Sequence, residues 1–507
     1  MGNCFIRFFP CRVQQRARNA LSYRMLDALI QAWPTVFAVM HAAAAAAVTV
    51  DAVLRKRHVS AVIGWVGLAW LAPGIGSLLY LVFGINRIQR NSVALDLRAA
   101  WGNDKHPIPA EASSSAAQAL LQADVGLAGL EQLCDRLTGK PLLAGNHIDA
   151  LEDGDAAYPA MLAAISGAQR SITLATYIFD NDAAGQAFLL ALRGARERGV
   201  EVRVLLDGLG LRYSRPDMLR ALRRAGITAA AFSPTRNPLR TRYANLRNHR
   251  KIMVVDGALG FTGGMNIRVG HWLARRPANP VRCLHFGVRG PVVADLQRTF
   301  AVDWAYACGE HLLGEVWFPA LDACGPVAAR GVADGPDADI DNLPQVLLGA
   351  LAVARTRVRI VTPYFLPDET LLAALKVTAL RGVAVDIVLP ERSNLRVMDW
   401  ATRPQLTELL ASGCRIHLSP PPFDHTKLLL VDEHWSLIGS TNWDARSLRL
   451  NFEYNLVCIN EELAQTLNSL VDARVGSARR LGMAELRDLP VLARLRNGVA
   501  RLMSPYL

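Results

Sequence analysis

The chain has 507 residues, 51% of them hydrophobic, and a formal net charge of +12 at neutral pH. This length exceeds that of one ordinary domain, and the apolar share excludes a disordered chain. The positive charge favours anionic partners, either nucleic acid or acidic phospholipid. The 8 cysteines include no C-x-x-C pair and no zinc-finger spacing, and they do not indicate a disulfide scaffold in a chain this long.

Two apolar segments follow a basic N-terminal stretch, residues 1–30. Residues 33–50 are dominated by alanine, and residues 59–84 contain no charged side chain. A helix that crosses a bilayer needs about 20 mostly apolar residues, so the second segment qualifies and the first is borderline. We expect a transmembrane helical hairpin over residues 31–90. The alternative is a buried helical pair in a soluble domain.

The rest of the chain repeats itself. The stretch ISGAQRSITLATYIFDND begins at Ile165, and the similar LAVARTRVRIVTPYFLPD begins at Leu351. In each copy an amphipathic helix and a second apolar strand follow, which predicts βαβ units and a mostly parallel sheet. We expect an α/β fold of two tandem repeats with pseudo-two-fold packing. The expected parts are a connector at 91–130, a first repeat at 131–310, a linker at 311–343 and a second repeat at 344–507.

Each repeat contains an H-x-K-x4-D motif. The first copy is His249, Lys251 and Asp256, and the second is His425, Lys427 and Asp432. Residues two apart on a strand point to the same face, so each histidine projects together with its lysine. Each aspartate lies five residues beyond its lysine, about 16 Å along a strand. We therefore interpret both aspartates as structural residues at hairpin turns.

The strand after each motif ends in Gly-Gly/Ser-x-Asn. A two-residue turn would place Asn442 opposite His425 and Ser440 opposite Lys427, and it would place Asn266 equivalently in the first hairpin. Lysine supplies a point charge, asparagine a neutral donor, and histidine a nucleophile or proton carrier. Each hairpin face is therefore predicted to bind a compact anion.

At these motifs the chain resembles the phospholipase D superfamily, whose signature is a paired H-x-K-x4-D followed by G-[SG]-x-N. More narrowly, the segments APGIGSLLYLVFGINR, GSTNWDARSLRLNFEYN and RLMSPYL are similar to those of bacterial cardiolipin synthases with an N-terminal membrane hairpin. The resemblance covers about residues 55–507. It implies that both motifs meet in one active site, which works without a metal or any other cofactor.

The resemblance also implies roles for residues. One histidine attacks phosphorus and the other protonates the leaving alcohol, while lysines and asparagines hold the phosphate. By analogy His249 is the nucleophile and His425 the general acid and base, although the sequence leaves the order open. Asn451 and Glu453 are implied near the second histidine, with Glu453 among the substrate-binding residues. Relatives commonly carry Asp-Thr-His in the first repeat at the segment that begins here with Cys283.

The implied reaction moves a phosphatidyl group from one phosphatidylglycerol to another and releases glycerol. The expected place is the inner (plasma) membrane of a bacterial cell, with a multi-pass anchor. The expected partners are phosphatidylglycerol and anionic membrane lipid, without nucleic acid. The alternatives are a hydrolytic phospholipase D, a phosphatidyltransferase with another donor lipid, a nucleic-acid phosphodiesterase and a non-catalytic scaffold. The sequence leaves open the oligomeric state and the acyl-chain preference.

Overall fold

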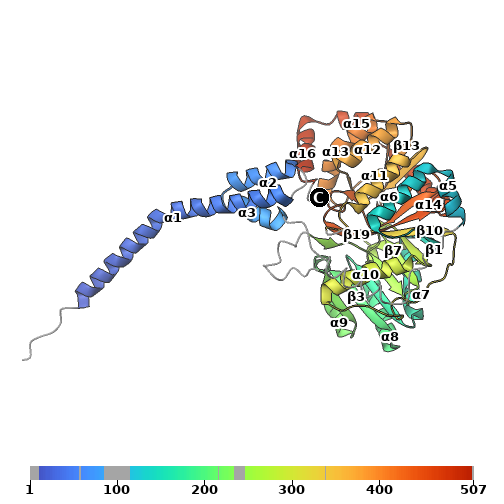
Figure 1. The fold of residues 1–507 in the computed structure, drawn as a ribbon, viewed down its shortest axis with the longest axis horizontal. Helices are drawn as coiled ribbons and strands as arrows, with labels where there is room; N and C mark the ends of the chain where they lie inside the picture. The colour runs from blue at the N-terminus through green and yellow to red at the C-terminus, as the bar shows by residue number, and fades with distance from the viewer. Residues whose placement is uncertain are drawn as a thin grey trace, which may run out of the picture. The chain divides into compact units, whose positions relative to one another are not determined.

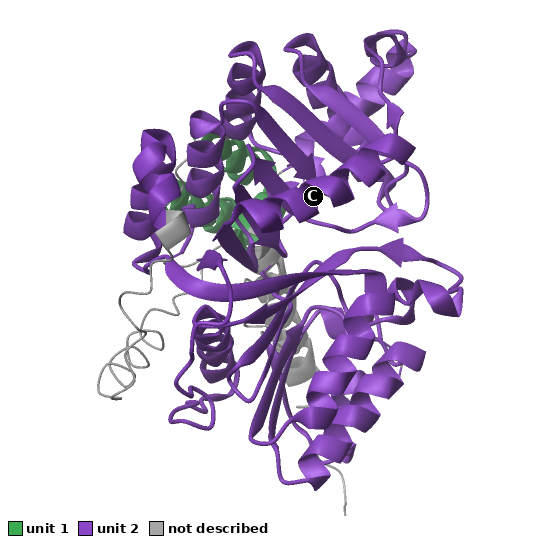
Figure 2. Cartoon of the chain, turned by 90° about the vertical axis from the view of Figure 1, so that its right-hand side faces the viewer, with its two compact units in different colours: residues 1–86 green, residues 87–507 purple. Residues whose placement is uncertain are grey.

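The computed structural model describes residues 11–55, 59–84, 115–214, 216–232, 246–336 and 339–504. Two compact units, Met1–Asn86 and Arg87–Leu507, divide the chain (Figure 2). Much of the connector expected at 91–130 lies outside the described residues. Its last part belongs to two helices, α5 (Ser115–Ala123) and α6 (Val125–Thr138).

The N-terminal unit is helical. It consists of α1 (Cys11–Arg55), α2 (Val59–Leu71), α3 (Ile75–Leu79) and a π-helical turn (Tyr80–Gly84). Within α1, Gln31–Arg55 is long and apolar enough to cross a membrane. Helices α1 and α2 pack against each other through a small apolar cluster that includes Ala45 and Ala69, and the Trp70 indole donates a hydrogen bond to Thr49 Oγ1 (3.1 Å).

The second apolar segment, residues 59–84, is not the single helix that was predicted. Helix α2 ends at Leu71 because Pro73 disfavours helical backbone at the residue before it, and Gly74 adopts a positive φ of 72°. The 13 residues of α2 span about 20 Å at 1.5 Å per residue, which is less than the hydrocarbon thickness of a bilayer. The segment is therefore a helix interrupted at residues 72–74, with α2 before the break and α3 and the π-helical turn after it, rather than one unbroken helix.

In the described part of the second unit, a mixed sheet of 16 strands runs through both repeats. The strands of the first half are β1 (Leu143–Glu152), β2 (Ser171–Thr176), β3 (Glu201–Asp207), β4 (Thr228–Phe232), β6 (Ile252–Val255), β7 (Leu259–Gly263) and β9 (Leu284–Arg289). Their counterparts are β10 (Val327–Asp334), β11 (Arg357–Val361), β13 (Ala384–Pro390), β14 (Arg415–Ser419), β16 (Leu428–Val431), β17 (Trp435–Gly439) and β19 (Asn451–Ile459).

The strand order shows the predicted pseudo-two-fold symmetry. The order β4-β3-β2-β6-β7-β9-β1 continues as β10-β19-β17-β16-β11-β13-β14, so the counterparts recur in reverse, and β20 (Arg479–Arg480) closes the far edge. The antiparallel pair β1 and β10 lies at the centre (Figure 1). The expectation of a mostly parallel sheet is wrong for the inner strands, which pair in antiparallel fashion. Among them, β6 and β7 form a hairpin through the short turn Asp256–Ala258.

Helices cover the sheet in both halves. The first half contains α7 (Asp153–Gly167), α8 (Ala183–Glu197), α9 (Met218–Arg224) and α10 (Val293–Cys308). The second contains α11 (Asn342–Val353), α12 (Glu369–Leu380), α13 (Arg396–Ala411), α14 (Glu461–Ser477), α15 (Met483–Arg487) and α16 (Val491–Leu502). One buried cluster draws on both halves, with Val254 and Phe286 from the first and Leu430 and Leu456 from the second. The two repeats therefore share a core.

The segment expected as a linker, residues 311–343, supplies the central strand β10. Its sequence VAARGVAD contains three alanines and one glycine, residue types that are depleted in strands, so propensity did not indicate a strand. Ala328 and Ala329 are nevertheless almost completely buried between β1 and β19. Small side chains suit this position because the two halves meet closely there.

Candidate active site

Two short strands bring the motifs together across the boundary between the halves. Strand β5 (Arg247–Asn248) precedes the first histidine and pairs with the start of β19 in the second half. Strand β15 (Phe423–Asp424) precedes the second histidine and pairs with β8 (Val281–Arg282) in the first half. Each motif is therefore anchored to a strand of the opposite repeat.

The backbone of each motif histidine also forms a hydrogen bond with the opposite repeat. The N–H of His249 donates to the carbonyl oxygen of Phe452 (2.9 Å), and the N–H of His425 donates to that of Arg282 (2.7 Å). Phe452 and Arg282 therefore occupy equivalent positions in the two repeats. It follows that Glu453 and Cys283, the next residues along the chain, are also equivalent.

The side chain of His249 is oriented by Glu453. Nδ1 of His249 lies 2.9 Å from Oε1 of Glu453, and because an ionised carboxylate only accepts, Nδ1 carries the proton and Nε2 keeps its lone pair. Glu453 is fully buried, and it also accepts from Ser440 Oγ (2.5 Å) and from Asn451 Nδ2 (3.1 Å). The implied placement of Glu453 beside the second histidine, His425, is wrong. Because β5 pairs with β19, Glu453 lies beside the first histidine, His249.

The side chain of His425 has a different partner. Its Nδ1 lies 2.9 Å from the carbonyl oxygen of Gly264, which fixes the same tautomer because a carbonyl also only accepts. Cys283, at the position equivalent to Glu453, is fully buried. A Cβ at Gly264 would lie 2.8 Å from Cys283 Sγ and 3.2 Å from Lys427 Cδ, so only glycine allows this close approach of the two halves.

The two lysines are buried and arranged alike. Nζ of Lys251 donates to the carbonyl oxygen of His249 (2.6 Å), and Nζ of Lys427 donates to that of His425 (2.6 Å). Burial lowers the pKa of Lys251 to about 7, and the charge of Lys427 contributes to this shift. Burial likewise lowers the pKa of Lys427 to about 8. A bound anion would favour the charged form of both lysines.

Both histidines are neutral near pH 7 when no anion is bound. Burial lowers the pKa of His249 to about 4, in spite of the opposing effect of Glu453. Burial lowers the pKa of His425 well below its usual value, and the charges of Lys427 and Lys251 lower it further. This arrangement provides two imidazole Nε2 atoms with lone pairs beside two cationic side chains, which suits nucleophilic attack on a phosphodiester.

The two aspartates of the motifs lie at the hairpin turns. Asp256, at a positive φ of 52°, accepts hydrogen bonds from the backbone N–H groups of Gln169 (2.9 Å), Arg170 (2.7 Å) and Ser171 (3.0 Å). Asp432, at 54°, binds the equivalent N–H groups before β11. Each aspartate therefore ties its hairpin to the start of the neighbouring strand.

The predicted hairpin register is wrong by one residue. Val255 pairs with Leu259 and Val431 with Trp435, so each loop holds three residues rather than two. The extra residue is accommodated because the aspartate that opens each loop adopts the left-handed conformation. Register therefore does not place the asparagines opposite the histidines, nor Ser440 opposite Lys427.

The asparagines lie beyond the ends of their strands. Strand β7 ends at Gly263, and Oδ1 of Asn266 accepts from the N–H of Ile178 (3.2 Å). Nδ2 of Asn442 donates to Ser447 Oγ (3.1 Å). Both side chains are buried. Each asparagine thus connects the end of its hairpin to a neighbouring loop.

Comparison with known proteins identifies the family of this site. A family model described as cardiolipin synthase, PLD-like domain, matches residues 161–304 and 347–474. Cardiolipin synthase A of Pseudomonas aeruginosa is 34% identical over 461 residues, which cover 90% of this chain and 93% of that relative. The chain belongs to the cardiolipin synthase family.

A second relative agrees with this cardiolipin synthase membership and confirms the resemblance, and a solved structure shows the same fold. Cardiolipin synthase of Alkalihalophilus pseudofirmus is 30% identical over 468 residues, which cover 89% of this chain and 90% of that relative. The crystal structure of a phosphatidylserine synthase from Haemophilus influenzae aligns with a TM-score of 0.58 at 16% identity, covering 75% of this chain and all of that one. The second comparison shows a shared fold.

Aromatic rings surround the two histidines in this cardiolipin synthase family member. The ring of Tyr177 lies 5.1 Å from that of His249, and the ring of Tyr364 lies 6.3 Å from that of His425. The ring of His271 lies 6.2 Å from that of His425. Sequence reasoning missed His271, which belongs to a short 3-10 turn after GGMNI and carries no motif of its own.

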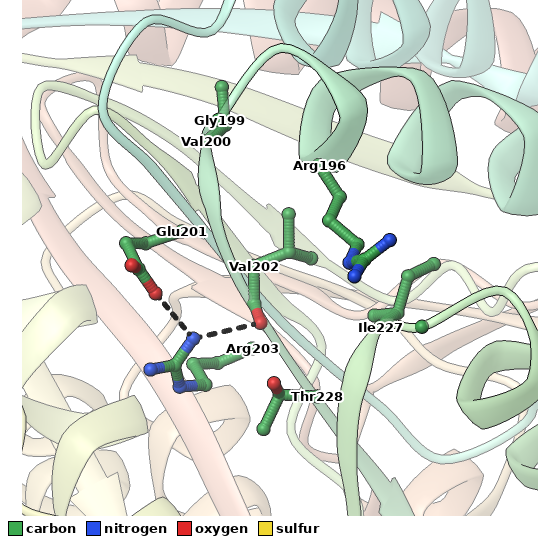
Figure 3. Close-up of a pocket in the computed structure, with 9 residues that line it drawn as sticks. Arg196, Gly199, Val200, Glu201, Val202, Arg203, Ile227 and Thr228 are labelled. Atoms are coloured by element: carbon green, nitrogen blue, oxygen red, sulfur yellow. Dashed lines mark hydrogen bonds and ion pairs between the residues drawn. The ribbon is translucent and has the colours of Figure 1, made fainter.

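A surface hollow of about 250 Å³ lies outside this site (Figure 3). Glu201 and Arg203, at the start of β3, line this hollow. Asp207, at the opposite end of β3, accepts a hydrogen bond from the backbone N–H of Asn248 beside the first motif (2.8 Å). The hollow and the first motif therefore lie at opposite ends of β3. Within the described ranges, no group of three or more His, Cys, Asp and Glu side chains is arranged to hold a metal ion.

Proposed function

We propose that the chain synthesises cardiolipin by transferring a phosphatidyl group from one phosphatidylglycerol to a second through a phosphohistidine, with release of glycerol. The observation that carries this proposal is the pair of imidazoles fixed as Nδ1–H tautomers beside two buried lysines, in a member of the cardiolipin synthase family. A two-step displacement lets a second alcohol replace water as acceptor.

In the first step Nε2 of His249 attacks phosphorus, and the bond from phosphorus to the glycerol oxygen breaks. The negative charge of the bound phosphodiester favours proton uptake by His425, which then gives its Nε2 proton to the departing glycerol. In the second step the neutral His425 accepts the proton of a hydroxyl on the second phosphatidylglycerol. That oxygen attacks phosphorus, and the phosphorus–nitrogen bond breaks. The proton count of the enzyme is restored at the end of the cycle.

The assignment of His249 as nucleophile draws support from Glu453. A histidine phosphorylated at Nε2 that keeps its Nδ1 proton carries a positive charge on the ring. Glu453 accepts from that Nδ1 and stabilises this charge, whereas the partner of His425 is a neutral carbonyl. The intermediate is therefore better stabilised on His249 than on His425.

The remaining site residues are proposed to hold the phosphate. Lys251 and Lys427 supply the positive charge, and Asn266 and Asn442 supply neutral donors once they turn toward the phosphoryl oxygens. Ser440 acts through Glu453, to which it donates a hydrogen bond. Asp256 and Asp432 keep the structural role that their turn positions support.

The membrane anchor is proposed to be multi-pass and to lie in the plasma membrane of a bacterial cell. Helix Gln31–Arg55 is long and apolar enough to cross a bilayer, and α2 packs on α1 within the same unit. The two repeats are proposed to begin near residues 131 and 344. The net charge of +12 suits phosphatidylglycerol and other anionic lipids as partners.

The test uses the full chain reconstituted in phosphatidylglycerol vesicles. Equimolar glycerol and a tetra-acyl lipid support the transferase, and phosphatidic acid supports a hydrolase instead. Product formed only after another donor lipid is added supports a different phosphatidyltransferase. Absence of all lipid products, or cleavage of nucleic acid instead, overturns the proposal. His249→Ala and His425→Ala should each abolish turnover, whereas His434→Ala, at a hairpin turn, should keep it.

A further inference from the structure

Helix α16 (Val491–Leu502), near the C-terminus, presents an apolar face to the outside. Its exposed aliphatic residues, with their exposed fractions, are Val491 (75%), Leu492 (79%), Leu495 (63%), Val499 (55%) and Leu502 (79%). At about 100° per residue, these five positions lie within one third of the helix circumference. Large aliphatic side chains are thus gathered on one exposed face.

The opposite face attaches the helix to α13 through small and polar residues. Asn497 and Ala500 are buried, and Ala500 packs against Met398 and Ala401 of α13. The apolar face therefore points away from the second unit and contributes nothing to its core. Exposing a contiguous apolar face to water is unfavourable in free energy, which indicates that a membrane or another molecule covers this face.

The flanks of the apolar face are basic. Arg494 and Arg496 are exposed, and the guanidinium of Arg496 lies 4.5 Å from the centre of the Trp400 ring. A guanidinium nitrogen of Arg501 lies 3.9 Å from Oε1 of Glu408 in α13. The helix sequence VLARLRNGVARL contains no acidic residue. Aliphatic residues flanked by arginines match an anionic bilayer surface, where the apolar face enters the acyl boundary and the arginines meet headgroups.

Helix α16 is also close to the candidate active site. Ala500 belongs to a buried cluster with Leu366, and Tyr364 packs against that cluster. The ring of Tyr364 lies 6.3 Å from that of His425. A bilayer in contact with α16 would thus lie within a few side-chain layers of the histidine to which we assign proton transfer.

We propose that α16 lies in the headgroup region of the bilayer that supplies the substrate, with its apolar face inserted, and that it orients the active site toward lipid phosphodiesters. The identity of that lipid, phosphatidylglycerol, rests on the proposed function. The contact itself is a second attachment to the membrane, located in the second unit and separate from the N-terminal helices. It positions the catalytic histidines rather than taking part in the reaction.

The test places a fluorescent non-natural amino acid at position 495 of the full chain. The matched control carries it at position 190, because Leu190 of α8 is equally exposed at 63%. Both proteins are reconstituted in vesicles of phosphatidylcholine with or without phosphatidylglycerol, and lipids carrying a quencher on the acyl chain are added. We expect at least twofold stronger quenching at 495 than at 190, and more quenching with phosphatidylglycerol. Equal quenching at both positions overturns the proposal.

A second copy of the chain is the competing occupant of this face. A photo-crosslinking amino acid at position 495 would then yield a covalent dimer in detergent and in vesicles alike, and this result also overturns the proposal. Crosslinking to lipid without such a dimer supports it.

An activity ratio separates this inference from the proposed function. Leu495→Glu should lower the ratio of turnover on phosphatidylglycerol vesicles to turnover on dispersed short-chain phosphatidylglycerol at least fivefold. Leu190→Glu should leave that ratio unchanged, and an equal fall in both variants overturns the proposal. If the unmodified protein turns over neither substrate, the proposed function fails, while the quenching result still decides the placement of α16.

Discussion

Nδ1 of His249 lies 2.9 Å from Oε1 of Glu453, and these two residues belong to different repeats. The contact exists because β5 pairs with β19 across the boundary between the halves. The equivalent position beside His425 holds Cys283, so the two histidines of a symmetric fold have different environments. This difference supports the proposed roles of His249 as nucleophile and His425 as proton carrier.

Glu453→Gln should reduce kcat by about 10²- to 10⁴-fold, the range expected when a catalytic histidine loses its carboxylate partner. Glutamine can still accept from Nδ1 of His249, but it cannot stabilise a positive charge on the phosphorylated ring. Rapid quenching under alkaline conditions, followed by peptide mass spectrometry, should show slower formation of the phosphohistidine at position 249. Ser440→Ala, which removes one donor to Glu453, should cost about tenfold. Turnover of Glu453→Gln within about threefold of the unmodified protein would contradict this role.

Cys283→Asp should extend activity to higher pH. A carboxylate beside Lys427 and the Gly264 carbonyl raises the pKa of His425, which burial now lowers, so the protonated form needed for the leaving alcohol persists further into the alkaline range. The pH profile of kcat measures this shift. Cys283→Ser alters size and polarity without adding charge, and its profile should match that of the unmodified protein. Identical profiles for the serine and aspartate variants would rule out the electrostatic explanation.

The KM for phosphatidylglycerol should rise with pH by at least about tenfold between pH 7 and 9. The pKa values of Lys251 and Lys427 are lowered to about 7 and about 8, so both side chains are charged below pH 7 and lose their protons as pH rises through these values. Binding an anion above this range requires proton uptake, which weakens apparent affinity by linkage. In the Lys427→Arg variant the guanidinium stays charged at every pH tested, so KM should rise less steeply with pH than in the unmodified protein. A KM independent of pH would show that neither lysine titrates in this range.

The paired motifs and the βαβ repeats were predictable because they depend on residue identity and on periodic hydrophobicity. The exchange of strands was not, since β5 and β15 have two residues each and carry no periodic pattern. Glu453 was therefore expected beside the histidine nearest in sequence, although it contacts the other one. The hairpin register was missed because the left-handed backbone at Asp256 adds a residue to the loop, which sequence spacing does not reveal.

Asp256→Ala should destabilise the protein while leaving catalysis nearly intact. The substitution removes a carboxylate that accepts from three backbone N–H groups, at Gln169, Arg170 and Ser171, and alanine is disfavoured at a φ of 52°. We expect the free energy of unfolding to fall by about 2–4 kcal/mol, measured by denaturant unfolding in detergent. Turnover per folded molecule should stay within about twofold, because Lys251 lies at the other end of the strand. Asp256→Asn, whose amide oxygen still accepts and whose backbone tolerates the left-handed region, should lose less than half as much stability. A stable Asp256→Ala protein with turnover reduced a hundredfold would instead place this carboxylate in the reaction.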